Sequence, residues 1–191
     1  MEFDFLVIGS GIAGLWYALK VAATGKVGLI TKKHRTESNT NYAQGGIAAV
    51  MGTDDTFALH IHDTLAAGAG LCREEVVHAI VSEGPGLVRE LIAAGVKFSA
   101  DAGGEYDLGR EGGHTRRRVL HAGDITGREI ERALLAAVAA NPNIRVFEDV
   151  LAIDLITTQK LRMPGENRCL GCYALDEKRN VVEVYAAPVT L

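Results

Sequence analysis

Two short stretches near the start of the chain hold residue types that could bind a nucleotide with a flat redox ring. The first is a glycine turn, Gly9-Ser10-Gly11-Ile12-Ala13-Gly14, and the second is a polar stretch with paired glycines, Asn39-Thr40-Asn41-Tyr42-Ala43-Gln44-Gly45-Gly46. In such a turn the first glycine permits the tight bend, the second lets the backbone approach a pyrophosphate, and the third allows close helix packing. The hydroxyls, amides and glycines of the second stretch suit a polar, planar ring, so together the two stretches favour a flavin nucleotide.

A strand–turn–helix–strand unit is predicted to position the glycine turn. Residues 3–8 have the pattern of a buried parallel strand, residues 11–24 that of a helix, and residues 26–31 that of a second strand. The helix N-terminus offers N–H groups and a partial positive charge to phosphates. The acidic residue that usually follows about 20 residues on, to hold the ribose, is missing. The second strand runs instead into Lys32-Lys33-His34-Arg35, which leaves open NADP, a ribose held by backbone groups and Lys32, or a solvated turn.

The rest of the chain predicts an α/β fold: a Rossmann-like domain with a parallel sheet, flanking helices and an antiparallel β-meander. Asp54 or Asp55 is expected to cap a helix ending near Gly68, and Gly84-Pro85 to separate helices over 74–81 and 85–94. A capping box at 126–129 opens a helix through residue 140. A parallel strand over 144–147 and a meander over 150–157, 170–175 and 181–185 complete the prediction.

Residues 107–121 form a second chemically dense region, rich in glycine, arginine and histidine. A carboxylate, Glu111, precedes Arg116, Arg117 and Arg118 in this region. The composition suits a site for a small dicarboxylate in which Glu111 attracts a positive group; the alternative is a loop with exposed charge. Successive strand residues alternate sides, so the three arginines cannot all face one ligand. At most one is expected to reach a carboxylate, and the others to face solvent or structural acids.

Composition excludes several classes of function. A net charge of −4 and a pI near 5.9 favour no nucleic-acid partner. No apolar run approaches a membrane span, and residues 1–20 lack a signal peptide's features, so a cytoplasmic protein is expected. Cys169 and Cys172 form a C-x-x-C pair, but without a second pair or a nearby histidine we expect no metal or redox site there.

Three sequence blocks together resemble the N-terminal part of the L-aspartate oxidases, within the succinate dehydrogenase and fumarate reductase flavoprotein family. They cover residues 7–14, 42–50 and 110–129, and the resemblance extends over residues 3–191. It implies FAD binding by the glycine turn, with the pyrophosphate on Ser10, Gly11, Ile12 and Ala13, between the turn glycine Gly9 and the packing glycine Gly14. The adenosine ribose would lie near Lys32, and the flavin end would be wrapped by Asn39, Thr40, Asn41, Tyr42, Ala43, Gln44, Gly45 and Gly46.

Two positions distinguish branches of this family. Fumarate reductases and succinate dehydrogenases carry a flavin-linked His where this chain has Asn39, so the resemblance implies non-covalent FAD. The dicarboxylate reductases carry an aromatic residue where this chain has Glu111, and a carboxylate there would attract the ammonium group of aspartate. The implied reaction moves a hydride from L-aspartate to FAD, giving iminoaspartate, with reoxidation by O2 or fumarate. The product feeds quinolinate and NAD synthesis, with a possible hand-off to quinolinate synthase.

The chain is much shorter than members of this family. We expect residues 1–191 to be a partial FAD/NAD(P)-binding domain with an excursion at about 53–125, without the capping domain, the C-terminal part and the family's catalytic arginine. His114 and His121 are acid–base candidates by chemistry alone, and neither is assigned. Such a fragment is expected to hold FAD weakly or not at all and to be inactive by itself. The alternative functions are a fumarate reductase or succinate dehydrogenase flavoprotein subunit, an NADP-binding dehydrogenase domain, and a non-catalytic nucleotide-binding or interaction module.

Overall fold

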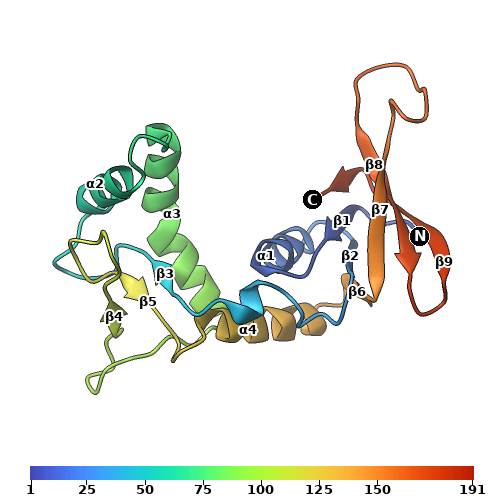
Figure 1. Ribbon diagram of the computed structural model, residues 1–191. Coiled ribbons are helices and arrows are strands. Elements are labelled where there is room, and N and C mark those ends of the chain that lie inside the picture. The colour runs from blue at the N-terminus through green and yellow to red at the C-terminus, as the bar shows by residue number, and fades with distance from the viewer. The chain divides into compact units, whose positions relative to one another are not determined.

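A four-stranded parallel sheet carries the glycine turn (Figure 1). The computed structural model describes residues 1–191, which divide into two units, residues 1–41 with 131–191 and residues 42–130. The sheet lies in the first unit, in the order β10-β1-β2-β6. Its strands are β1 (Phe5–Ile8), β2 (Val27–Thr31), β6 (Ile144–Glu148) and β10 (Val189–Thr190), so the predicted parallel strands are confirmed.

The antiparallel meander packs against this sheet. Its strands are β7 (Val150–Thr157), β8 (Cys169–Asp176) and β9 (Val181–Ala186). Leu6 and Ile30 of the parallel sheet share a buried core with Cys172, Ala174 and Tyr185 of the meander. We call the opposite side the outer meander face; its exposed apolar residues are Leu151, Tyr173, Val182 and Val184.

Helices α1 (Ile12–Val21) and α4 (Thr126–Ala140) agree with the predicted spans. Leu15 and Ala18 of α1 are fully buried, and α1 packs beside β1 and β2. In α4 the apolar positions Ile130, Ala133, Leu134 and Val138 recur at helical spacing and are buried. The mixed α/β class with a Rossmann-like parallel sheet is confirmed. None of the helices combines the length and the apolar composition that a membrane-spanning segment needs.

The second unit contains two long helices and a small antiparallel sheet (Figure 1). The helices α2 (Phe57–Ala67) and α3 (Glu74–Ala93) pack together through Ile61, Val77 and Val81. The sheet has the order β3-β5-β4, from Ile47–Ala48, Val119–Leu120 and Leu108–Gly109. The short 3-10 helix η1 (Thr40–Tyr42) spans the residues where the two units divide.

Two details of the helix predictions are wrong. Residues 74–93 form one helix, α3, with Pro85 inside it, and not two helices separated at Gly84-Pro85. Proline normally clashes with the Cβ of the preceding residue, and Gly84 has none, so the helix can continue through this position. The N-cap of α2 is Thr56, whose Oγ1 accepts a hydrogen bond from Leu59 N–H, and not Asp54 or Asp55. Asp55 is buried instead in an ion pair, described below.

Candidate functional site: the glycine turn and the Glu111 cavity

The glycine turn has the geometry that close approach of a ligand requires. Gly9 has φ +114°, which side-chain-bearing residues rarely adopt. A Cβ at Gly14 would lie 2.1 Å from the Gly9 carbonyl oxygen, so only glycine fits where α1 meets the turn. A Cβ at Gly11 would meet only Thr40 Oγ1, at 3.5 Å. Packing therefore does not require glycine at position 11, and the backbone there is open, as the close approach of a phosphate in such turns requires.

The hydroxyls of Thr31 and Thr40 hold the glycine turn in place through hydrogen bonds. Ser10 and Thr31 share a buried hydrogen bond of 3.1 Å, which ties the turn to the end of β2. Ser10 is predicted to lie on the pyrophosphate, and with its hydroxyl occupied it would contribute chiefly its backbone. Thr40 Oγ1 accepts a hydrogen bond from Ile12 N–H at 3.1 Å. Since the first turn of α1 has no acidic residue and Gly11 supplies no side-chain cap, the positive end of the helix dipole suits an anion.

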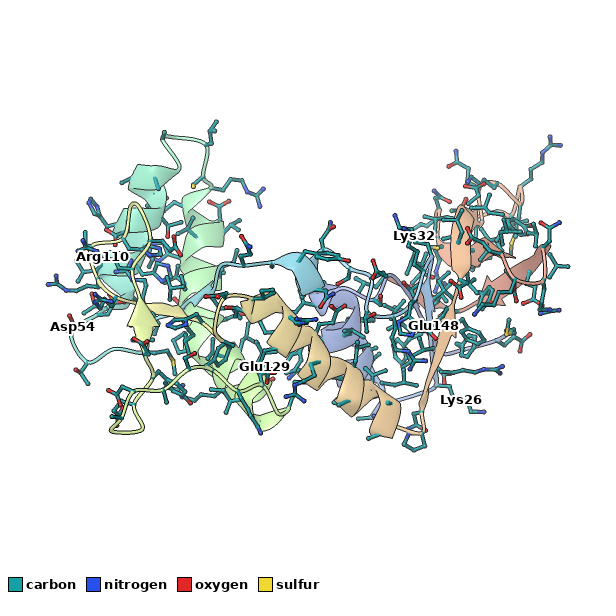
Figure 2. All side chains as sticks on the ribbon, turned by 60° about the horizontal axis from the view of Figure 1, so that its bottom comes forward. Lys26, Lys32, Asp54, Arg110, Glu129 and Glu148 are labelled. Atoms are coloured by element: carbon teal, nitrogen blue, oxygen red, sulfur yellow. The ribbon has the colours of Figure 1, made fainter.

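The basic run after β2 is divided between a structural and an exposed part. Arg35 makes a bidentate contact with Glu148, the last residue of β6, with distances of 2.9 Å (Nε–Oε1) and 3.1 Å (Nη2–Oε2). Figure 2 labels Glu148. The Arg35 backbone N–H also donates to Oε1 at 2.8 Å. The hydrogen bond from the Arg35 guanidinium lowers the pKa of Glu148 to about 2. Lys32 and Lys33 are exposed. This leaves Lys32 as the cation placed nearest the end of β2, while Arg35 is held by Glu148.

A cavity of about 390 Å³ in the second unit brings together two of the predicted regions. Gln44, Gly45 and Gly46 of the polar stretch line it together with Glu111. The remaining lining residues are Gly109, Val119, His121, Gly123 and Asp124. Packing requires glycine at position 46, because a Cβ there would lie 2.2 Å from the Leu120 carbonyl oxygen. A Cβ at Gly45 would meet nothing within 4 Å, so the backbone at Gly45 faces open space.

The loop that carries Glu111 rests on a buried ion-pair network. Arg118 is fully buried; it contacts both oxygens of Asp55, at 2.8 and 2.9 Å, and Asp63 Oδ2 at 2.6 Å. Asp63 Oδ2 also accepts hydrogen bonds from the Thr115 N–H and hydroxyl, at 2.8 and 2.9 Å. Burial opposes ionisation of Asp63, but these hydrogen bonds and Arg118 lower its pKa to about 2. The network thus anchors both ends of the segment from Thr115 to Arg118.

Each of the three arginines is engaged by the protein, as the alternation argument allowed. Arg116 Nε donates to the Asp54 carbonyl at 3.1 Å, and Arg117 Nη1 donates to the Leu108 carbonyl at 3.2 Å. The expectation that one of them reaches a ligand carboxylate has no support in these contacts. In Figure 2 the labelled Arg110 marks the loop that carries Glu111.

The two histidines of this region differ in surroundings. His121 lines the cavity, and its Nε2 lies 3.5 Å from Asp107 Oδ2. His114 Nδ1 is buried without a hydrogen-bond partner, and its ring packs edge-on against His60 with centroids 6.0 Å apart. Burial and the nearby Arg118 lower the pKa of His60. His121 is thus the histidine placed where it could face a substrate.

Several site residues escaped sequence reasoning because their partners are distant in the chain. Glu148 lies 113 residues from Arg35, and Asp55 and Asp63 lie 63 and 55 residues from Arg118. No local pattern links such pairs. One cysteine of the C-x-x-C pair has a packing role. Cys172 is buried in the core between the sheet and the meander, and burial raises the pKa of its thiol to about 11.

Together the parallel sheet, the glycine turn and the open N-terminus of α1 define a dinucleotide-binding domain of the Rossmann type. The chain belongs to the FAD binding domain family, whose model matches residues 4–190. The predicted cofactor, FAD, and the predicted resemblance are confirmed by this match and by the relatives below.

Two similar curated proteins are named L-aspartate oxidase. L-aspartate oxidase 2-a, chloroplastic, of Nicotiana tabacum is 52% identical over 99% of this chain and 29% of its own length. L-aspartate oxidase 1 of Ralstonia nicotianae is 46% identical over 100% of this chain and 36% of its own length. Among solved structures, the E. coli quinol fumarate reductase has a TM-score of 0.90 and 28% identity, covering 100% of this chain and 32% of that chain. The chain therefore spans about a third of the length of these relatives.

Proposed function

We propose that this chain is the FAD-binding part of an enzyme that oxidises L-aspartate to iminoaspartate. The observation that carries the proposal is the cavity in which Glu111 lies with Gln44, Gly45 and Gly46. It offers one polar site with glycine backbone for a flavin and a carboxylate for an ammonium group. The names of the curated relatives support the same reading.

In this proposal the protein's part is positioning and electrostatics. The backbone of the glycine turn and the dipole of α1 bind the pyrophosphate, Lys32 lies near the ribose, and the residues from Asn39 to Gly46 hold the flavin end. Glu111 binds the α-ammonium of aspartate and so orients its Cα–H. Bound FAD supplies the hydride acceptor, and O2 or fumarate reoxidises it. The general acid or base stays unassigned.

A test of the Glu111 role compares two substrates in a full-length enzyme that carries this domain. The Glu111→Gln change removes the charge that attracts an ammonium group and retains the size of the side chain. We expect the preference for aspartate over succinate, measured as the ratio of their binding constants, to fall about tenfold or more, because a hydrogen bond to a charged group is worth about 1.5–3 kcal/mol. Glu105→Gln, an exposed change in the same unit, is the control. An unchanged ratio in Glu111→Gln would exclude this role.

A fumarate reductase or succinate dehydrogenase flavoprotein is the second candidate, and the likeness to the E. coli quinol fumarate reductase favours it. Glu111 and Asn39 argue against it, by the resemblance described above. An NADP-dependent dehydrogenase is less well supported, because Arg35 is paired with Glu148. A titration of a full-length enzyme that carries this domain separates these: the proposal expects the enzyme to take up FAD with its visible absorbance, and tight NADPH binding without FAD uptake would contradict it.

The cellular setting is part of the proposal. A cytoplasmic enzyme whose product passes to quinolinate synthase and so to NAD synthesis would fit the reaction. The plant relative is named as chloroplastic, so the compartment differs among proteins of this kind. Fractionation of cells with an antibody against the chain would establish the compartment, and co-purification of quinolinate synthase would test the hand-off.

A further inference from the structure

Glu131 is a buried carboxyl group that the proposed chemistry does not use. It lies on α4, and only 1% of it is exposed. The Ser38 hydroxyl donates a hydrogen bond to Glu131 Oε1 at 2.7 Å. Glu131 Oε2 is buried without a hydrogen-bond partner. A buried carboxylate normally has a cation or several donors beside it, so this environment favours the neutral acid.

The electrostatic surroundings agree with a neutral Glu131. Burial raises the pKa of Glu131, the hydrogen bond from Ser38 opposes this, and the like charge of Glu37 raises the pKa further. An acid that keeps its proton can accept from Ser38 at one oxygen without leaving a buried negative charge.

Ser38 connects Glu131 with the turn that follows. Ser38 Oγ accepts a hydrogen bond from Asn41 N–H at 3.3 Å, and the Ser38 carbonyl accepts from the same N–H at 3.2 Å. This closes the turn that contains Thr40. Thr40 Oγ1 in turn accepts from Ile12 N–H at the start of α1. A continuous set of hydrogen bonds therefore leads from α4 through residues 38–41 to the glycine turn.

We propose that Glu131, as a neutral carboxylic acid, is a positioning residue that holds residues 38–41 in the shape that receives FAD. This inference rests on the proposed FAD site, since residues 39–41 belong to it. Glu131 itself is not placed in contact with the cofactor. It acts through Ser38, which it fixes in one rotamer, and thereby keeps Thr40 on the N-terminus of α1.

Amide hydrogen exchange in the absence of FAD tests the structural half of the proposal. In Glu131→Ala we expect the protection of Asn41 and Ile12 amides to fall about fivefold to tenfold, the effect of losing one hydrogen bond. Glu131→Gln carries no charge and can still accept from Ser38, so its protection should stay within about twofold of the parent. Ser38→Ala removes the contact from the other side and should behave like Glu131→Ala. Glu83→Ala, an exposed change on α3, is the control. Unchanged protection in Glu131→Ala and Ser38→Ala, or lost protection in Glu131→Gln, would overturn the inference.

An FAD titration of a full-length enzyme that carries this domain, as the parent and with the same substitutions, followed by quenching of flavin fluorescence, tests the cofactor half. Glu131→Ala and Ser38→Ala should each raise the dissociation constant about tenfold, and the double variant should be no weaker than either alone, because the two residues act as a unit. Glu131→Gln should bind as the parent does; weakened binding in Glu131→Gln would show that the charge is required and overturn the neutral-acid claim. Unaltered affinity in Glu131→Ala would overturn the cofactor half. A parent protein that binds no FAD would contradict the proposed function and this half together, while the exchange result would still decide the structural half.

Discussion

At the scale of single residues, Arg118 is a fully buried cation of the second unit. Its guanidinium forms ion pairs with Asp55 and Asp63, and Asp63 also accepts hydrogen bonds from Thr115. A buried charge is tolerable only when it is paired, so the three side chains depend on one another. The network also supports the loop that carries Glu111, so a change in the network is expected to disturb the proposed substrate site as well as stability.

Removing Arg118 should therefore be costly. In Arg118→Ala two buried carboxylates lose their cation, and we expect the free energy of unfolding to fall by about 3–5 kcal/mol. Arg116→Ala, a neighbouring change at a half-exposed side chain, should cost less than about 1 kcal/mol. Urea unfolding followed by circular dichroism measures both. Equal effects of the two changes would show that the buried network adds no stability of its own.

At the scale of elements, the segment after β2 is held to β6 by Arg35 and Glu148. The ion pair depresses the pKa of Glu148, so its contribution to stability is present above the ordinary glutamate pKa and lost as the pH falls towards the folded value of about 2.

The pH dependence of unfolding tests this pair. Between about pH 4.5 and 2 the parent should lose about 1–2 kcal/mol more than Glu148→Gln, which has no carboxyl to protonate. Thermal unfolding at several pH values supplies the measurement. Parallel curves for the two proteins across that window would mean that the pair is not stabilising.

Helix α3 offers a second test at this scale. Gly86 lies inside the helix, and a Cβ there would meet nothing within 4 Å. Gly86→Ala should raise the free energy of unfolding by about 0.5–1 kcal/mol through helix propensity. Gly84→Ala should gain less or lose stability, because its new Cβ would precede Pro85. Chemical denaturation measures the free energy of unfolding of both variants. An equal increase at both positions would refute the explanation that the missing Cβ of Gly84 lets helix α3 continue through Pro85.

The sequence predicted most elements because their signals are local. Apolar runs and glycine spacing indicate β1, α1 and β2, and the meander predicted over residues 150–157, 170–175 and 181–185 agrees with β7, β8 and β9. The predicted break at Pro85 is wrong. Gly84 has no Cβ to clash with the proline ring, so helix α3 continues through this position. The support of the Glu111 loop could not be predicted, since Arg118, Asp55 and Asp63 meet only in the folded unit. The burial of Glu131 could likewise not be predicted, because its partner Ser38 lies 93 residues away in the sequence.

At the scale of the whole molecule, each unit has its own buried core. Leu6 and Ile30 belong to the core of the first unit, and Ala49, Val88 and Leu120 to that of the second. The chain corresponds to about a third of its relatives' length, and the FAD binding domain model matches nearly all of it.

The mode of FAD attachment is a property of the loaded protein. The carboxamide of Asn39 does not form the flavin bond that a histidine forms, so we expect the flavin to be non-covalent. Acid precipitation of the FAD-loaded protein should leave nearly all of the flavin in the supernatant, measured by its fluorescence. Flavin that stays in the pellet after washing and denaturation would contradict this prediction.

The outer meander face affects how the protein must be handled. Val182 and Val184 are 58% and 44% exposed, and they lie on β9, at an edge of the meander. An exposed apolar strip promotes self-association, and sulfate or phosphate salts strengthen it. Light scattering is therefore expected to grow with protein concentration and with such salts. Dilute samples in chloride buffers are the better conditions for purification and storage.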